Sequence, residues 1–172
     1  IFNRDGLLEF IRECRYLGLI GQAVHIKLDT GMHRLGFGKD DLSWLCEVLK
    51  APELKVVSIF SHLAGSDNPP LDSFTRLQAD RLKWMSGEIM HAIDSQSMMH
   101  ILNSTGIERF PEFQFDMVRL GIGLYGVGKN ESLVPVNSFR TVISQVHELE
   151  AGETVSYNRS GELVRDSRIA TI

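Results

Sequence analysis

The chain has 172 residues, enough for one domain with a hydrophobic core and the start of another. Its hydrophobic content of 43% and charged content of 23% are ordinary for a soluble globular protein. The formal net charge of −4 is small, so there is no electrostatic case for nucleic acid or an anionic membrane as a partner. No apolar run approaches the ~18 residues of a membrane span, and no charged-then-apolar leader opens the chain.

The two cysteines bear on the compartment. Cys14 and Cys46 each lie within an amphipathic helical pattern. This placement favours buried free thiols over a disulfide or a metal site. We therefore expect a cytoplasmic protein without a metal centre.

The two ends of the chain suggest a longer protein. The chain opens at Ile1 without a methionine and closes inside the apolar run at 168–172. Because a natural terminus rarely stops within a strand, we expect both ends to be cuts.

Helical and strand-like segments alternate through the first 118 residues. The spacing of apolar residues predicts helices over 4–17, over the segment that Asp40 or Asp41 caps, and over roughly 71–93. Short segments, partly β-branched, predict strands at 23–28, 55–61, 98–102 and 115–118. Such alternation is typical of parallel βα units.

Beyond residue 126 the helical patterns stop. Residues 138–149 and 163–172 have strand patterns, with a turn at 150–153, which indicates a domain boundary near 127–137. A closed (β/α)₈ barrel takes about 250 residues and eight strands, whereas about four βα units are present here. We therefore predict an α/β fold: a partial (β/α)₈ TIM-type barrel over 1–130, followed by the start of a β-rich C-terminal domain over 131–172.

Reactive side chains follow four consecutive predicted strands. The carboxyl ends of parallel strands meet at one rim, where sites are built. A single charged residue there can simply mark where a strand leaves the core, but four strands in succession favour a functional site. Lys27 and Asp29 end the first strand and Arg34 lies just past it, His62 ends the second, Asn103 and Ser104 end the third, and Arg119 ends the fourth.

Two of these segments suggest a phosphorylated ligand. Ser104 begins a predicted helical turn, and Gly121-Ile122-Gly123 closely follows Arg119. Free backbone N–H groups and a hydroxyl form a phosphate cradle without needing a cation. Gly121 permits close approach of the backbone to the anion.

Five blocks of the sequence resemble those of a known family. The blocks that carry the resemblance are VHIKLDTGMHRLGF (24–37), SHLAGSD (61–67), HILNSTG (100–106), DMVRLGIGLYG (116–126) and ETVSYN (153–158). In order and spacing they are similar to bacterial alanine racemases. The resemblance implies an isomerase that uses pyridoxal 5′-phosphate (PLP) to interconvert L- and D-alanine for peptidoglycan synthesis. It also implies a homodimer whose active sites are shared between subunits. In several bacteria this enzyme is fused behind a cell-wall Mur ligase.

The resemblance also implies roles for single residues. Arg119 would face the pyridine nitrogen of PLP. Arginine does not give up a proton at neutral pH, so the ring nitrogen would stay unprotonated. That weakens the ring as an electron sink and limits transamination and decarboxylation. Related decarboxylases place a carboxylate at this position.

Tyr157 resembles the tyrosine that exchanges the Cα proton on one face of the substrate. The free phenol has a pKa of about 10, so it needs cationic help to act as a base. In the family this help comes through a chain from the tyrosine through His62 and Arg119 to His100. The tyrosine serves the barrel of the other subunit.

The remaining positions match the cofactor site. Asn103, Ser104, Gly121 and Ile122 match residues around PLP, with Ser104 and two backbone amides at the phosphate. Arg34 matches an arginine on the phenolate oxygen, and Lys27 a lysine, carbamylated in some members, that orients that arginine. Structural roles compete with these assignments: His62 and His100 as core histidines, and Lys27 as an ion-pair partner of Asp29. We assign no role to His25, His33, His91 or His147.

The sequence departs from the family's pattern in three respects. Leu120 stands where many members have proline, and Asn158 where glycine is common, although asparagine tolerates the same left-handed backbone. The family's PLP-binding lysine, in a motif of the form V-K-A-N-A-Y-G-H-G, does not occur in the chain. We therefore expect the isolated chain neither to racemise alanine nor to bind PLP tightly.

Other functions stay open at this stage. A racemase for serine or another amino acid is one alternative, because the segments that select the substrate side chain are missing from the chain. A non-catalytic PLP-binding barrel protein is disfavoured because such proteins lack the β-rich segment that carries Tyr157. An inert folded fragment is the structural alternative.

Overall fold

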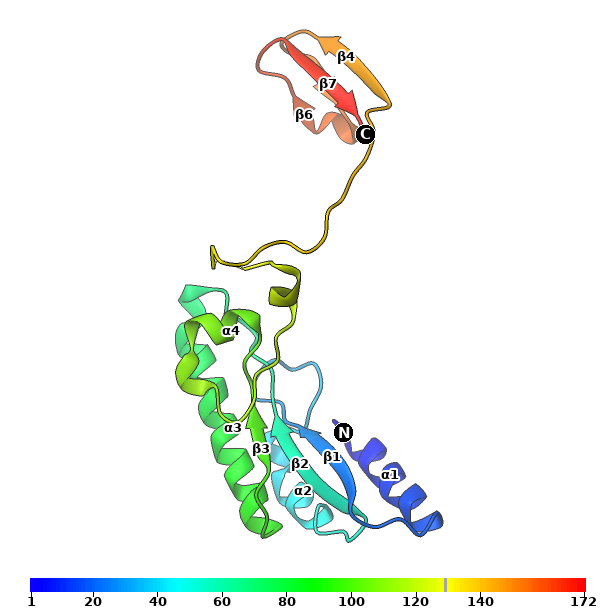
Figure 1. Cartoon of the computed structure of the whole chain (residues 1–172), viewed down its shortest axis with the longest axis vertical. Coiled ribbons are helices and arrows are strands. Elements are labelled where there is room, and N and C mark those ends of the chain that lie inside the picture. Colours follow the sequence, from blue (N-terminus) through cyan, green and yellow to red (C-terminus); the bar gives the residue numbers. More distant parts are fainter. Residues whose placement is uncertain (129) are drawn as a thin grey trace. The chain divides into compact units, whose positions relative to one another are not determined.

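The structure, a computed structural model, describes residues 1–128 and 130–172. The chain divides into two compact units, Ile1–Val136 and Asn137–Ile172. The first unit contains α1 (Arg4–Tyr16), β1 (Gln22–Lys27), α2 (Leu42–Val48), β2 (Leu54–Phe60), α3 (Asp72–Ala92), β3 (Met98–His100) and α4 (Ser104–Arg109) (Figure 1). The second contains β4 (Gln145–Leu149), β5 (Thr154–Val155), β6 (Gly161–Glu162) and β7 (Ser167–Thr171). Among these described helices, none combines the length and hydropathy that a bilayer crossing requires.

The first unit is built on a parallel sheet. Its strand order is β1-β2-β3, and both pairs are parallel, which confirms the predicted βα units. The register between β1 and β2 shifts after Val24, so that Val24 pairs with Val56 but His25 pairs with Ser58. Val57 is therefore an extra residue in β2, a β-bulge.

The predicted strand around 115–118 is not a regular strand. One parallel bridge joins Met117 to His100, and the only regular strands among the described residues of this unit are β1, β2 and β3. Two local features interrupt the ladder: Phe115 has a φ of 50°, and the Asp116 side chain accepts the Met99 N–H at 2.7 Å. The segment still runs beside β3, because Arg119 N donates to Leu102 O at 3.0 Å.

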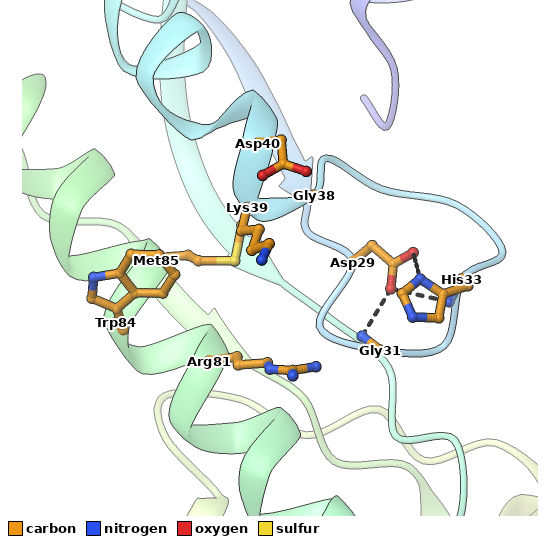
Figure 2. Close-up of a pocket in the computed structure, with 9 residues that line it drawn as sticks. All are labelled: Asp29, Gly31, His33, Gly38, Lys39, Asp40, Arg81, Trp84 and Met85. Atoms are coloured by element: carbon orange, nitrogen blue, oxygen red, sulfur yellow. Dashed lines mark hydrogen bonds and ion pairs between the residues drawn. The ribbon is translucent and has the colours of Figure 1, made fainter.

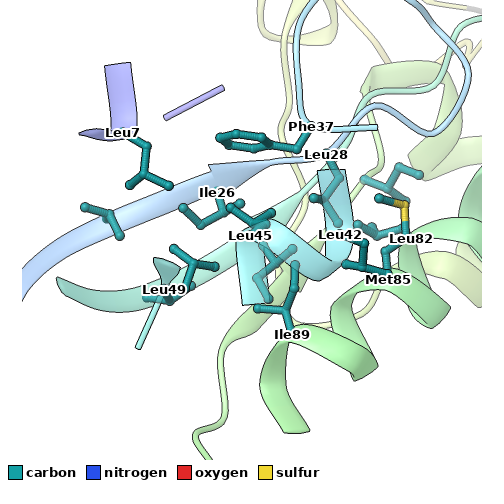
Figure 3. Packing of buried hydrophobic residues seen from close by; sticks show 14 of the residues in the cluster. Leu7, Ile26, Leu28, Phe37, Leu42, Leu45, Leu49, Leu82, Met85 and Ile89 are labelled. Atoms are coloured by element: carbon teal, nitrogen blue, oxygen red, sulfur yellow. The ribbon is translucent and has the colours of Figure 1, made fainter. Parts of the chain in front are cut away.

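The core lies between one face of the sheet and the helices. Alternate residues of a strand point to opposite faces, and Val24 and Ile26 are the buried ones in β1. They pack against apolar side chains of α1, α2 and α3 (Figure 3). Helix α1 contributes Leu7 and Ile11, and Asn3 caps its N-terminus by accepting the Gly6 N–H with its side chain at 2.8 Å.

The second unit is entirely strands and turns in the described residues. β4 pairs with β7 and β5 with β6, both antiparallel. The predicted strand at 138–149 is shorter than expected, because the five residues of β7 pair only with Gln145–Leu149. The predicted strand at 163–172 is likewise confined to Ser167–Thr171.

Helix α3 offers a matched test of the packing. Leu82 is fully buried, whereas Leu77 on the same helix is 43% exposed. Leu82→Ala should lower the free energy of unfolding by about 2–5 kcal/mol, because it leaves a cavity in the core. Leu77→Ala should change it by less than about 0.5 kcal/mol. Urea unfolding of the chain followed by circular dichroism measures both, and equal effects would refute the packing described.

Candidate active site

The carboxyl ends of the three strands meet around one aromatic ring. Lys27, Phe60 and His100 are partners in the sheet register, so their side chains share the face opposite the core. The His100 ring stacks on Phe60 with centroids 4.8 Å apart and planes 11° apart. Lys27 Nζ and Arg119 Cζ lie 5.3 and 5.1 Å from the centre of the Phe60 ring. Phe60 therefore organises two cations and one imidazole.

Arg119 is held by neutral acceptors. Its Nη2 donates to Ser61 O at 2.6 Å, to Ile101 O at 3.3 Å and to His62 Nδ1 at 3.3 Å. Its Nη1 donates to His100 Nδ1 and, at 3.4 Å, to His100 O. No carboxylate forms an ion pair with it among the described residues. The guanidinium therefore stays an uncompensated positive charge, and burial lowers its pKa.

The two histidines beside Arg119 are kept neutral. His100 is only 3% exposed; desolvation, then the charges of Arg119 and His25, lower its pKa to about 4. Desolvation also lowers the pKa of His62, with further contributions from Arg119, Lys27 and Arg34. A guanidinium only donates, so both Nδ1 atoms must accept.

The loop after β1 returns to the strand end. Phe37 N donates to Lys27 O and Asp29 N to Phe37 O, both at 2.9 Å. Gly36 is required at this closure: its φ is 128°, and a Cβ there would lie 2.6 Å from the Asp29 nitrogen. The loop thus carries Arg34, whose side chain is exposed, near the strand ends.

The Lys27 ammonium lies near two other cations, Arg119 and Arg34. Desolvation, followed by the charges of Arg119 and Arg34, lowers its pKa, and Asp29 opposes the shift only weakly. Asp29 instead accepts the backbone N–H groups of Gly31 at 2.9 Å and His33 at 3.1 Å. Lys27 therefore has a larger fraction of neutral amine near neutral pH than an ordinary lysine.

The segments predicted to hold phosphate also meet. The Ser104 hydroxyl accepts the N–H groups of Gly121 at 3.0 Å and Gly123 at 3.1 Å. Two backbone donors thus converge on the hydroxyl oxygen of Ser104. Asn103 Oδ1 accepts Gly106 N at 2.9 Å and Ser66 Oγ at 2.8 Å, so this oxygen is a helix cap. Ile122 begins a 3₁₀ turn with an exposed side chain.

Tyr157 lies in the second unit, and its side chain is 92% exposed. The backbone around it has positive φ at Ser156, Asn158 and Arg159, with φ of 56° at Asn158. Asn158 adopts the left-handed conformation that asparagine tolerates.

Three residues of the cluster escaped the sequence analysis. Phe60 sits in a strand rich in Val and Ile, where an aromatic residue indicates core, and Ser58 is an ordinary strand residue. His25 was assigned no role, yet its Nδ1 lies 2.6 Å from Ser58 Oγ. Their common signal is two-residue spacing: His25 precedes Lys27, and Ser58 and Phe60 precede His62, by steps of two.

A separate cavity of about 380 Å³ lies between the 29–40 loop and α3 (Figure 2). Arg81 reaches across it and donates to Thr30 O at 3.1 Å, which braces the loop. Of the strand-end residues named from the sequence, only Asp29 lines it. The lining residues are Asp29, Gly31, His33, Gly38, Lys39, Asp40, Arg81, Trp84 and Met85.

These strands form part of an α/β barrel whose carboxyl end carries the cationic rim and the two converging amides. The sequence profile of the alanine racemase N-terminal domain matches residues 9–129. The chain belongs to the alanine racemase family and spans part of its TIM-barrel N-terminal domain, as the motifs predicted.

Relatives and solved structures agree with this assignment. The alanine racemase of Chlorobaculum tepidum is 37% identical over 156 residues, covering 87% of this chain and 40% of that protein. The alanine racemase of Clostridium tetani is 34% identical over 158 residues, covering 87% of this chain and 41% of that protein. The chain thus spans about two fifths of these relatives. The alanine racemase of Streptomyces coelicolor A3(2) superposes with a TM-score of 0.80 at 26% identity, covering 99% of this chain and 47% of that one. The alanine racemase of Bartonella henselae, solved with covalently bound pyridoxal phosphate, superposes with a TM-score of 0.73 at 28% sequence identity. The match covers 95% of this chain and 45% of that one.

The neutral histidines predict a pH dependence of stability. Because the pKa of His100 falls from 6.5 to about 4 on folding, the unfolded chain binds protons more readily in this window. The contribution of His100 to the free energy of unfolding should therefore be complete above pH 6.5. As the pH drops toward 4, the free energy of unfolding should fall by up to about 3 kcal/mol for this residue. Urea unfolding at pH 5 and 7.5 measures the slope. His100→Phe should flatten it and the exposed control His91→Asn should not; an unchanged slope in His100→Phe would refute the assignment.

Proposed function

We propose that the protein carrying this chain is a PLP-dependent alanine racemase, which interconverts L- and D-alanine. The observation that carries the proposal is Arg119, a cation held only by neutral acceptors at the strand ends, in a chain of this family. We further assign the unit up to Val136 to the barrel, expected over 1–130, and the remainder to the β-rich C-terminal domain, expected over 131–172.

The described residues fit PLP. Its phosphate would lie beside the Ser104 hydroxyl, on which the amides of Gly121 and Gly123 converge, and would also meet the amide of Ile122 between them, since such donors bind anions without a cation. Both Nη atoms of Arg119 are engaged, whereas its Nε–H has no acceptor among the described residues and suits a ring nitrogen. Arg34 would meet the phenolate oxygen, and Asn103 and His100 would border the ring. When bound, the cofactor withdraws electrons from the substrate Cα and so acidifies its proton.

Arg119 would keep the chemistry confined to racemisation. It donates and does not give up its proton at neutral pH, so a ring nitrogen bonded to it stays unprotonated. The neutral His62 and His100 hold the guanidinium in place without neutralising its charge. Lys27, whose pKa is lowered, is the amine that we propose to be carbamylated and to orient Arg34.

Tyr157 would exchange the Cα proton on one face. It would take help from His62, whose other ring nitrogen is free to bond a phenol because Nδ1 accepts from Arg119. Positive φ angles on both sides of Tyr157 are a backbone feature that concentrates at functional sites. In a homodimer, this tyrosine would serve the partner's barrel. The product would feed cytoplasmic peptidoglycan synthesis.

The complete protein tests the proposal directly. With L-alanine and PLP in D₂O, we expect D-alanine that carries deuterium at Cα. Arg119→Lys keeps the charge but loses the planar fork, so kcat/KM should fall by about 10²-fold or more. His91→Asn, on the exposed side of α3, is the matched control and should retain wild-type turnover.

Three outcomes would contradict the proposal. Faster turnover of L-serine would make the protein a racemase of another specificity. Tight binding of PLP without turnover of any amino acid would make it a carrier. An Arg119→Lys enzyme with wild-type turnover would remove the stated role of the guanidinium.

The 172-residue chain alone should be inactive. It contains no V-K-A-N-A-Y-G-H-G motif and so lacks the lysine that would hold the cofactor and act on the opposite face of Cα. We expect no racemisation and no retained cofactor absorption band after gel filtration with PLP. A retained band or measurable turnover would refute this prediction.

A further inference from the structure

A line of polar side chains crosses the open face of the sheet, one from each strand. Ser58 Oγ in β2 lies 2.6 Å from His25 Nδ1 in β1 and 3.1 Å from His100 Nε2 in β3. The bulge at Val57 makes this line possible, because it pairs Ser58 with His25 in the register. The line continues the Arg119–His100 contact away from the site and belongs to none of the roles assigned above.

The direction of each hydrogen bond follows from Arg119. Because the guanidinium only donates, His100 Nδ1 accepts, and the neutral ring carries its proton on Nε2. That proton is donated to Ser58 Oγ. The hydroxyl hydrogen of Ser58 is then free to be donated to His25 Nδ1.

Stacking alone does not define the His100 ring. Its contact with Phe60 fixes the ring plane, but a half-turn about Cβ–Cγ preserves that plane. Such a turn would present a C–H edge, in place of Nδ1, to Arg119. Hydrogen bonds to opposite nitrogens of the ring, from Arg119 and to Ser58, select one of the two orientations.

His25 controls the hydroxyl of Ser58. While its Nδ1 accepts the hydroxyl hydrogen, a lone pair of Ser58 Oγ faces His100. Without that acceptor the hydroxyl hydrogen could turn toward His100 Nε2. It would then favour the tautomer with the proton on Nδ1, which would oppose the N–H of Arg119.

We propose that Ser58 and His25 are positioning residues that fix the orientation and tautomer of His100, and through it the aim of Arg119. The effect on catalysis rests on the proposed racemase function. The effect on the His100 ring does not, because it needs neither cofactor nor substrate.

Long-range ¹H–¹⁵N spectra of the histidine rings in the uniformly ¹⁵N-labelled chain test the first effect, since ring ¹⁵N shifts distinguish protonated from unprotonated nitrogens. Wild type should give one His100 signal set, with Nδ1 unprotonated and Nε2 protonated. Ser58→Ala and His25→Phe should give a second set or averaged shifts. His25→Asn keeps an acceptor near the Nδ1 position and should restore the wild-type set.

The comparison of variants separates positioning from packing. His25 is exposed, so His25→Phe keeps the test valid if Ser58→Ala does not fold. His91→Asn, on α3, should leave the His100 signals unchanged. If folded His25→Phe gives the wild-type His100 signal set, the proposal is overturned, whether or not Ser58→Ala folds.

Steady-state kinetics of the complete, PLP-loaded protein test the second effect. Ser58→Ala and His25→Phe should lower kcat for L-alanine by roughly tenfold, with a much smaller change in KM, and His25→Asn should recover most of the loss. Changed His100 signals with wild-type kcat in both variants would refute the positioning role. A wild-type protein that does not racemise alanine would instead refute the proposed function and leave the result from the ring spectra standing.

Discussion

The site depends on a partly buried cation that no carboxylate neutralises in the described part of the chain. Arg119 is held by backbone carbonyls at the ends of β2 and β3 and by two imidazole nitrogens. An arginine paired with an acid would project little net charge, whereas one held by neutral acceptors keeps its full charge and a fixed direction. The cost is desolvation, which appears as lowered pKa values for Arg119, His62, His100 and Lys27 alike.

The architecture of the sheet makes this arrangement possible. Parallel pairing brings Lys27, Phe60 and His100 into one row, and the Phe60 ring contacts both cations and stacks on the imidazole. The opposite face of the same strands packs on α1, α2 and α3 and supplies the rigidity that the row needs. The bulge in β2 pairs Ser58 with His25, and Ser58 in turn bonds Nε2 of His100. A single register thus serves both the core and the site.

Sequence reasoning predicted what depends on local pattern. Short segments, partly β-branched, identified β1, β2 and β3, and the strand-end rule led to Lys27, His62 and Arg119. It did not foresee the bulge at Val57, because the register of a parallel pair is set by tertiary packing. It predicted a strand at 115–118, because nothing in the sequence indicates that the Asp116 side chain accepts the N–H of Met99 in β3. Phe60 and Ser58 were missed since neither residue type marks a site in a strand. The family resemblance, rather than residue chemistry, led to Tyr157.

The central claim is that the charge of Arg119 acts on two neutral histidines. NMR titration of the His62 and His100 ring signals, in wild type and in Arg119→Gln, tests it most directly. The account predicts that both histidines titrate below their ordinary pKa in the wild type, His100 near 4, and that both pKa values rise in Arg119→Gln although desolvation remains. Ordinary wild-type values, or values that do not respond to the loss of the guanidinium, would contradict it.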